Sequence, residues 1–343
     1  MSSLFIDHVL KYRFLILLFT AIITISATPF IVKLGNDNSL SVWFDKESRE
    51  FRTYKRFLKT FHVEELIILG VEGIDYKDNK GLFDKISEAL NALKEVKRVY
   101  HLNDFSLFFL SPEEQFKGLL ISEDMGIYAF FIIPNTSNPS PHNRHVVDRI
   151  KEVLKKTLPM KTSYYLVGPP VLNAELDRAS NVQAKRFFPI VVLISALLIL
   201  IIFRSIRVLI ICFTTSFVCQ IWTLSLMSLM GKSMNMVTTA LPPLLWILSL
   251  SALIYMINTL FATGDIREAV NKVFKPCSLT IITTAFGFLS LCLSHIEPVR
   301  TMGIFTFIGL FITLLLSFTL APILLNNLNI NKVKHNKIDN THI

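Results

Sequence analysis

The chain has 343 residues, of which 52% are apolar and 18% are charged, and its formal net charge is +9. So small a share of charged residues, gathered into a few segments, excludes an ordinary soluble domain. The positive charge does not indicate nucleic acid as a partner. Basic and acidic residues are nearly balanced in residues 33–186, and the basic excess lies in short segments elsewhere.

Six apolar runs lack charged residues and are about long enough to cross a hydrocarbon core of roughly 30 Å. They are Phe14–Val32, Phe187–Phe203, Val208–Met230, Met234–Phe261, Cys277–Ser294 and Thr301–Leu325. The sequence therefore predicts a polytopic α-helical membrane protein with six transmembrane helices. The first run resembles a signal peptide, but its length and Pro29 after the only plausible cleavage position favour an uncleaved helix.

The short segments between the runs show which side of the membrane each one faces. Lys and Arg are in excess on one set of them, as is typical of cytoplasmic loops. We therefore expect both termini in the cytoplasm, beneath the inner membrane. The predicted divisions are a cytoplasmic N-terminus (1–13), the first transmembrane helix (14–32), an extracytoplasmic domain (33–186), a five-helix membrane bundle (187–325) and a polar cytoplasmic tail (326–343).

The extracytoplasmic segment begins with Ser39–Phe61, which reads as a loop followed by an amphipathic helix. Phe51, Tyr54 and Phe57 recur at helical spacing between charged residues. The helix either packs on its own domain, which is the simpler interpretation, or lies on the membrane surface.

The rest of this segment alternates between strand and helix patterns. Strands are predicted at Glu65–Val71, Val96–Leu102, Gly126–Ile133 and Ser163–Val167, and helices at Lys80–Leu93 and Asn143–Leu158. The order β-α-β-β-α-β predicts an α+β domain of the ferredoxin-like kind between transmembrane helices 1 and 2. Leu107–Ser122 has no clear assignment, and Asn135–His142 is a turn-rich linker.

No motif of a known enzyme class is present. CxxC, HExxH, GxGxxG, P-loop and nucleophile-elbow patterns are missing from the sequence, and the four cysteines lie inside predicted transmembrane helices. We therefore expect no cofactor, no metal site and no enzymatic activity, with no catalytic residues to assign.

Polar residues in the fourth and fifth runs are the main candidates for function. The fourth run carries no ionisable acid or base, yet Ser251, Tyr255 and Asn258 fall on one helical face. Such groups either let helices approach and hydrogen-bond, which is the simpler interpretation, or form a polar path that a partner's acidic residue completes. The candidates for this seam are Ser249, Ser251, Tyr255, Asn258, Thr283 and Thr284.

A second candidate set, Glu175, Asp177 and Arg178, lies at the outer end of the second run. These residues either gate the entry of a hydrophobic substrate into the outer domain or are simply solvated or cap the helix.

Several stretches, in this order and spacing, resemble transporters of the resistance–nodulation–division (RND) superfamily. They are Gly168–Ser180, Phe203–Arg207, Trp222–Asn235, Ala240–Leu245, Thr280–Pro298 and Met302–Leu325. The nearest branch is the MMPL and hopanoid-exporter-like lipid carriers, whose membrane core is akin to the sterol-sensing domain. The resemblance implies that the outer domain is a porter domain. It also implies a half unit, since such transporters usually contain two copies, so a homodimer or a second half-transporter chain is expected. A truncated, non-functional copy is the alternative.

The resemblance fails at one residue. Relatives usually carry an Asp for proton relay a few residues after the motif at Leu241–Leu245, where this sequence has Ala252. Tyr255 stands where a His is common. No other run supplies an acid, so the resemblance does not support proton-driven transport by this chain alone.

The function implied is therefore an RND-type half transporter that moves a lipid or other hydrophobic compound out of the inner membrane. The alternative is a subunit that binds or senses a lipid, or scaffolds a complex, without transport.

Overall fold

The structure is a computed structural model that describes residues 2–44, 48–61, 66–105, 116–124, 126–135, 143–159 and 162–326. It divides into two compact units: Met1–Asn36 with Ser180–Ile343, here called the membrane unit, and Asp37–Ala179, here called the sheet unit. Most of the linker at 135–142, residues 107–115 of the unassigned segment, and residues 327–343 of the tail lie outside the described residues.

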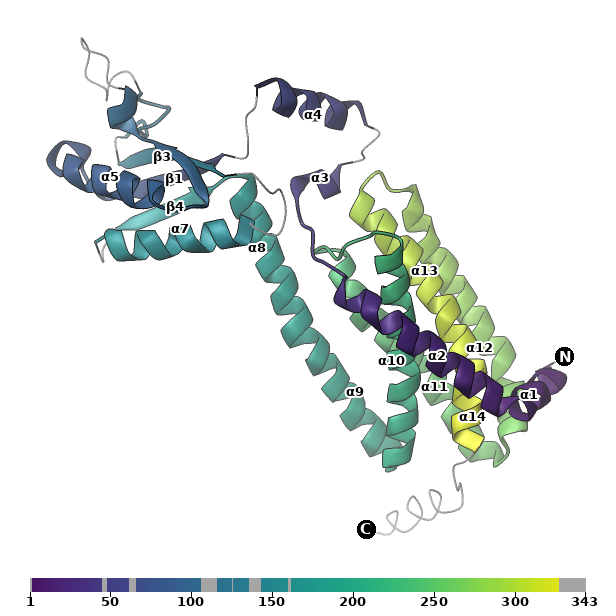
Figure 1. Cartoon of the computed structure of the whole chain (residues 1–343). Coiled ribbons are helices and arrows are strands. Elements are labelled where there is room, and N and C mark those ends of the chain that lie inside the picture. Colours follow the sequence, from purple (N-terminus) through teal and green to yellow (C-terminus); the bar gives the residue numbers. More distant parts are fainter. Residues whose placement is uncertain are drawn as a thin grey trace. The chain divides into compact units, whose positions relative to one another are not determined.

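In the part of the chain that the structure describes, six helices are long and apolar enough to cross a membrane. The membrane unit contains α1 (Ser2–Lys11), α2 (Arg13–Val32), α9 (Phe188–Phe203), α10 (Ile206–Leu229), α11 (Leu241–Thr263), α12 (Ile266–Leu289), α13 (Glu297–Phe318) and α14 (Leu320–Asn326) (Figure 1). This confirms a multi-pass membrane protein. α8 (Pro169–Val182) runs into α9 through a π-helical segment, η2 (Gln183–Phe187), as one continuous helix.

The turns between these helices are short because their residues adopt special backbone conformations. Arg204 ends α9 with φ 47° and Gly264 ends α11 with φ 80°, both left-handed. Gly264 takes this conformation at little cost. Asp265 then caps α12, its carboxylate accepting a hydrogen bond from the Arg267 backbone N–H.

Two helix boundaries differ from the sequence expectation. The fourth helix was expected from Met234 but starts at Leu241, after a short turn, η3 (Thr238–Ala240). Pro242 and Pro243 favour this start, since a first helical turn needs no backbone donors there. The charged segment 265–275 was expected as a separate helix, whereas it continues through Pro276 into α12.

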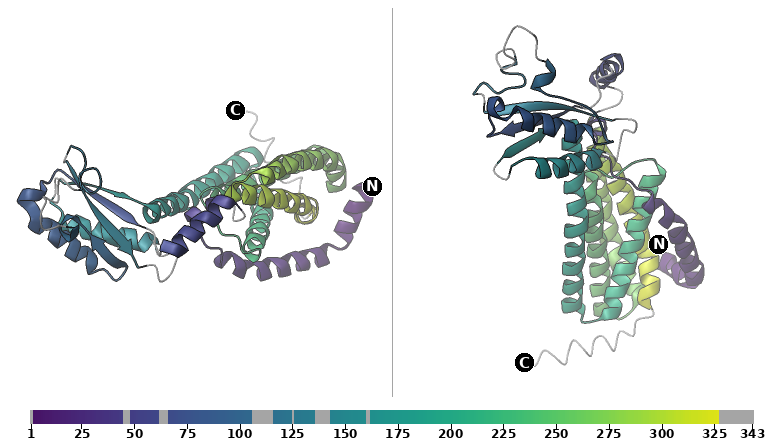
Figure 2. Two further views of the ribbon diagram at one scale, coloured as in Figure 1. Left: turned by 90° about the horizontal axis from the view of Figure 1, so that it is seen from above. Right: turned by 60° about the vertical axis from the view of Figure 1, so that its left-hand side comes forward.

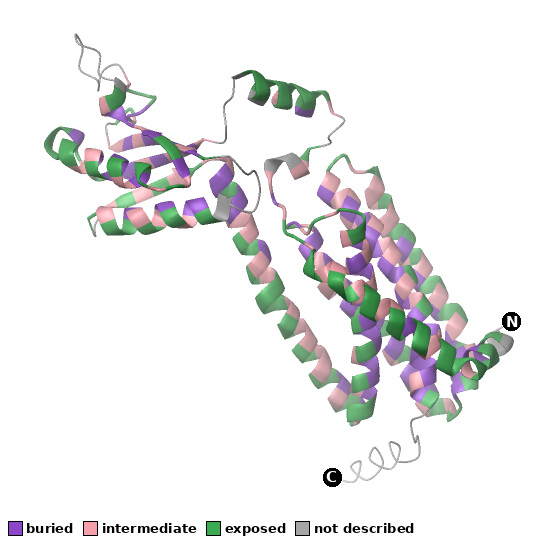
Figure 3. Cartoon of the chain, in the orientation of Figure 1, coloured by how far each residue is buried: buried purple, intermediate pink, exposed green. Residues whose placement is uncertain are grey.

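Burial divides the helices of the membrane unit into a centre and a periphery. α10, α11 and α13 are largely buried, whereas α2 and α9 expose most of their side chains (Figure 3). Glycines let the helices approach: Gly303 of α13 lies against the backbone of Phe288 in α12, and Gly309 lies against Leu245 of α11.

The sheet unit is built on four strands, β1 (Ile67–Glu72), β2 (Val96–Tyr100), β3 (Ile127–Pro134) and β4 (Ser163–Val167). Their order in the sheet is β2-β3-β1-β4 and all neighbours are antiparallel, with Leu69 opposite both Phe130 and Leu166. The helices α5 (Tyr76–Asn91) and α7 (Asn143–Thr157) complete the chain order β-α-β-β-α-β, a split βαβ arrangement.

Alternation along the strands makes the core of this unit. Ile67, Leu69 and Val71 of β1 are fully buried, while the residues between them are partly exposed. They pack with side chains of α5 and α7, which lie side by side (Figure 2). The shorter elements here are α3 (Leu40–Trp43), α4 (Arg49–Phe61) and η1 (Leu102–Phe105).

Candidate functional site

The central helix α11 borders two cavities of the membrane unit. The larger, here called the α9–α11 groove, has a volume of about 670 Å³ and apolar walls formed by residues such as Ile194 and Leu198 of α9 and Ile254 of α11. The smaller, here called the α11–α12 cavity, has a volume of about 360 Å³ and is completed by Leu310 of α13. The first volume is typical of small-molecule sites.

Three polar side chains of α11 line the α9–α11 groove: Ser251, Tyr255 and Asn258. All three are exposed, Tyr255 by 48%. Their side chains have no hydrogen-bond partner among the residues that the structure describes. A polar group without a partner is costly in a hydrocarbon environment. The groove therefore presents hydrogen-bonding groups to whatever occupies it.

The α11–α12 cavity lies beside the groove, and Ser251 and Tyr255 line both. Ala252 lines only the smaller cavity and is buried. The opposite wall comes from Thr280 and Thr284 of α12, whose hydroxyls donate to the carbonyls of Pro276 (3.0 Å) and Thr280 (2.8 Å). A methyl group thus faces two hydroxyls that are already hydrogen-bonded.

Two of the candidate seam residues lie outside both cavities. Thr283 is exposed on α12 and its hydroxyl donates to the Thr280 carbonyl at 2.9 Å. Ser249 is buried, with its hydroxyl 2.8 Å from Ser216 Oγ of α10 and 2.9 Å from the carbonyl oxygen of Trp246. Ser249 therefore joins two helices, as the simpler interpretation of the seam expects.

A buried tryptophan fixes the position of α9 relative to α11. The Trp246 indole N–H donates to Ser195 Oγ (3.0 Å), and Ser195 donates to the Val192 carbonyl (2.8 Å). The Trp246 ring is fully buried and meets Phe213 and Phe217 edge-on. Sequence reasoning missed this pair, although an indole N–H in an apolar helix always needs a partner.

A second polar set, also missed, lies inside the bundle on α10. Cys219 Sγ is 3.1 Å from Thr313 Oγ1 of α13, and the Gln220 side-chain amide donates to the Pro242 carbonyl at 2.6 Å. Ser216, Gln220 and Thr223 recur at helical spacing, which is the signal that sequence analysis had available.

The charged candidates near the second run belong to the sheet unit, on α8. Glu175 Oε1 is 2.6 Å from Lys151 Nζ of α7, and Arg178 is 2.7 Å from Asp148 of α7. The hydrogen bond from Lys151 lowers the pKa of Glu175, although partial burial opposes it. These ion pairs fasten α8 to α7.

Asp177 has a different partner. Its Oδ1 accepts a hydrogen bond of 2.6 Å from the side-chain amide of Asn38, a buried residue just before α3. The three charged candidates thus contact other elements of the sheet unit, which makes them more than solvated surface charges.

Among the described residues, no group of three or more His, Cys, Asp or Glu side chains is arranged to hold a metal ion.

The MMPL family model matches residues 51–256, more than half of the chain. The chain belongs to the MMPL family within the RND superfamily, and the resemblance expected from the sequence is confirmed. No curated protein sequence matches it.

A solved structure described as the X-ray crystal structure of a heavy metal efflux pump is similar, with a TM-score of 0.54 and 12% sequence identity. The alignment covers 92% of this chain and 47% of the pump chain, so this chain spans about half the length of that pump. At this identity the likeness shows a shared fold.

Proposed function

We propose that the chain is one half of an RND-type transporter that moves a lipid or other hydrophobic molecule out of the inner membrane. Both termini face the cytoplasm, and the sheet unit acts outside as a ferredoxin-like porter domain. Glu175, Asp177 and Arg178 hold α8 in the conformation that links porter domain and membrane helix. Family membership favours a transporter over an enzyme.

The observation that carries this proposal is the composition of the α9–α11 groove. Its walls are apolar, and its polar groups, Ser251, Tyr255 and Asn258, have no partner in the described part of the chain. An amphiphile with a hydrogen-bonding head and a hydrocarbon body satisfies both parts of the groove. A small polar solute would leave the apolar walls uncovered.

We propose further that a second copy, or a second half-transporter chain, completes the transporter. The chain spans about half the length of the similar pump chain. An acidic residue from a partner opposite Ala252 would supply the coupling group that this chain lacks.

Mutation of the groove tests the proposal. In full-length protein reconstituted with labelled phospholipid, the double substitution Tyr255→Phe, Asn258→Leu should lower lipid transfer several-fold. Thr283→Val is the matched control, because it removes an exposed hydroxyl of α12 that lines neither cavity. Equal transfer by the double variant and the wild type would contradict the groove as the substrate site.

The absence of a coupling acid favours a second candidate function. With Ala252 in place of the acid, the chain can bind or sense a lipid, or scaffold a partner, without transporting. A lipid that co-purifies but shows no gradient-dependent movement in liposomes would favour this function. Deletion of the gene separates the two in cells: transport predicts an altered distribution of an envelope lipid.

A further inference from the structure

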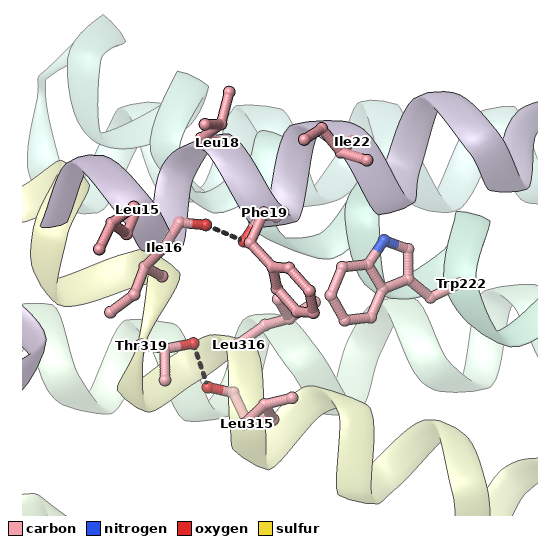
Figure 4. A pocket seen from close by; sticks show the side chains of 10 residues that line it. Leu15, Ile16, Leu18, Phe19, Ile22, Trp222, Leu315, Leu316 and Thr319 are labelled. Atoms are coloured by element: carbon pink, nitrogen blue, oxygen red, sulfur yellow. Dashed lines mark hydrogen bonds between the residues drawn. The ribbon is translucent and has the colours of Figure 1, made fainter. Parts of the chain in front are cut away.

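The membrane unit contains a third cavity, on the opposite side of the bundle centre from α9. It has a volume of about 520 Å³ and lies between α2, α10 and α13 (Figure 4). Leu15 and Phe19 of α2 face Leu316 of α13, with Trp222 of α10 at one end and Thr319 at the other. This cavity is here called the α2 groove.

Hydrogen bonds on one side and a helix break on the other shape the α2 groove. The Trp222 indole N–H donates to Thr24 Oγ1 at 3.0 Å, and Ser225 Oγ donates to the Ala27 carbonyl at 2.8 Å. These bonds hold the C-terminal half of α2 against α10. At the other end of the groove, α13 stops at Thr319 and α14 begins.

Every polar side chain that lines the α2 groove already has a partner. The Thr20 hydroxyl donates to the Ile16 carbonyl at 2.8 Å and the Thr319 hydroxyl to the Leu315 carbonyl at 2.6 Å (Figure 4). The Trp222 N–H is used by Thr24. No charged side chain lines the cavity. The groove thus offers a ligand dispersion contacts and no hydrogen bond.

We propose that the α2 groove binds one hydrocarbon chain of a membrane lipid, with the lipid's polar head outside the site. A bilayer supplies hydrocarbon chains at the depth of α2, whereas an empty apolar cavity of this size would lose contacts on all its walls. The α9–α11 groove differs, because its free hydroxyl and amide groups select a polar head. The two grooves therefore recognise different chemistry, and the α2 groove does not depend on transport.

Photolabelling tests this site in the full-length protein. The probe is a phosphatidylcholine with a mid-chain diazirine, present as a trace in phosphatidylcholine vesicles. In the wild type, labelled peptides should map to residues 15–22 and 315–319. Thr319→Phe fills the groove and should reduce that labelling several-fold. Thr28→Phe is the matched control, since Thr28 is exposed on α2, bonds its own helix in the same way, and does not line the groove.

A second variant and a competitor guard against misfolding and against binding of the head group. Leu15→Trp should also reduce labelling, whereas Phe14→Trp, at a 73% exposed position outside the groove, should not. A long alkane without a head group should compete with the probe. Equal labelling of Thr319→Phe and the wild type, labelling spread evenly over the exposed helix α9, or failure of the alkane to compete would each overturn the proposal.

Discussion

At the scale of single residues, the membrane unit depends on small side chains at helix crossings. A Cβ atom on Gly303 would lie 2.7 Å from the backbone oxygen of Phe288 and 2.8 Å from Leu291 Cβ. Backbone cannot move aside as a flexible side chain can. Gly287 of α12, in contrast, has nothing within 4 Å of that position. Two glycines in neighbouring helices thus have opposite structural roles.

We expect Gly303→Ala to destabilise the protein by about 1–3 kcal/mol through overpacking. Gly287→Ala should be neutral, or stabilise by up to about 1 kcal/mol through better helix propensity. Thermal unfolding of the two purified variants in one detergent measures this difference. Equal melting temperatures would show that α12 and α13 separate readily.

The charge pair between Glu175 and Lys151 predicts a dependence on pH. The pKa of Glu175 is lowered in the folded state, so its ionised form stabilises the fold. That stabilisation is complete above the unfolded value of 4.5 and is lost as pH falls through the lower folded pKa. Because the pair is largely exposed, its contribution is about 0.2–1 kcal/mol.

Accordingly, Glu175→Gln should speed hydrogen exchange in α7 and α8 at neutral pH, and the difference from wild type should shrink below pH 4.5. Glu152→Gln is the control, since Glu152 pairs only with Arg149 on its own helix. An effect of Glu175→Gln that is constant across this pH range would mean that packing, and not charge, is responsible.

At the scale of helices and strands, the hydrogen bond between Trp246 and Ser195 connects α9 to α11. Ser195→Ala leaves a buried indole N–H without a partner, which costs about 1–3 kcal/mol. Adding Trp246→Phe removes the donor as well and should recover part of the loss. Thermal unfolding of both single variants and the double variant measures the coupling. Strictly additive losses would exclude the bond as the link between the helices.

The helices and strands were predictable from sequence wherever one local pattern decides them. Alternation at Ile67–Val71 and the apolar runs of α10 and α13 are of this kind. The start of α11 at Leu241 was not, because Met234–Ala240 is as apolar as the helix that follows. Partnerships such as Ser216 with Ser249 depend on how helices cross, which no single helix encodes.

At the scale of the whole molecule, the candidate site is on the surface of the membrane unit. The α11 face with Tyr255 and Asn258 is open in this chain. Sequence showed that these residues share a face, since helical spacing determines that. It could not show that they border α9 and not α12, which depends on the packing of three helices.

A second copy, if it completes the transporter, should make the purified chain dimeric. Light scattering in a mild detergent should then give a protein mass near twice 39.1 kDa. Cysteine introduced at Asn258 in a background without the native cysteines should crosslink between copies, whereas cysteine at Ile25, on exposed α2, should not. A monodisperse monomer in several detergents and in nanodiscs would rule out the self-paired form and leave a separate partner chain.

The left-handed turns at Arg204 and Gly264 have a consequence for how the protein is made. Only two residues join α9 to α10 and two join α11 to α12, so the joined ends stay within about 7 Å of each other. Neither helix of a pair can settle in the bilayer while the other remains far away. Biosynthesis therefore delivers these four helices as two hairpins, and each hairpin brings its buried hydroxyls into the membrane together with a neighbouring helix.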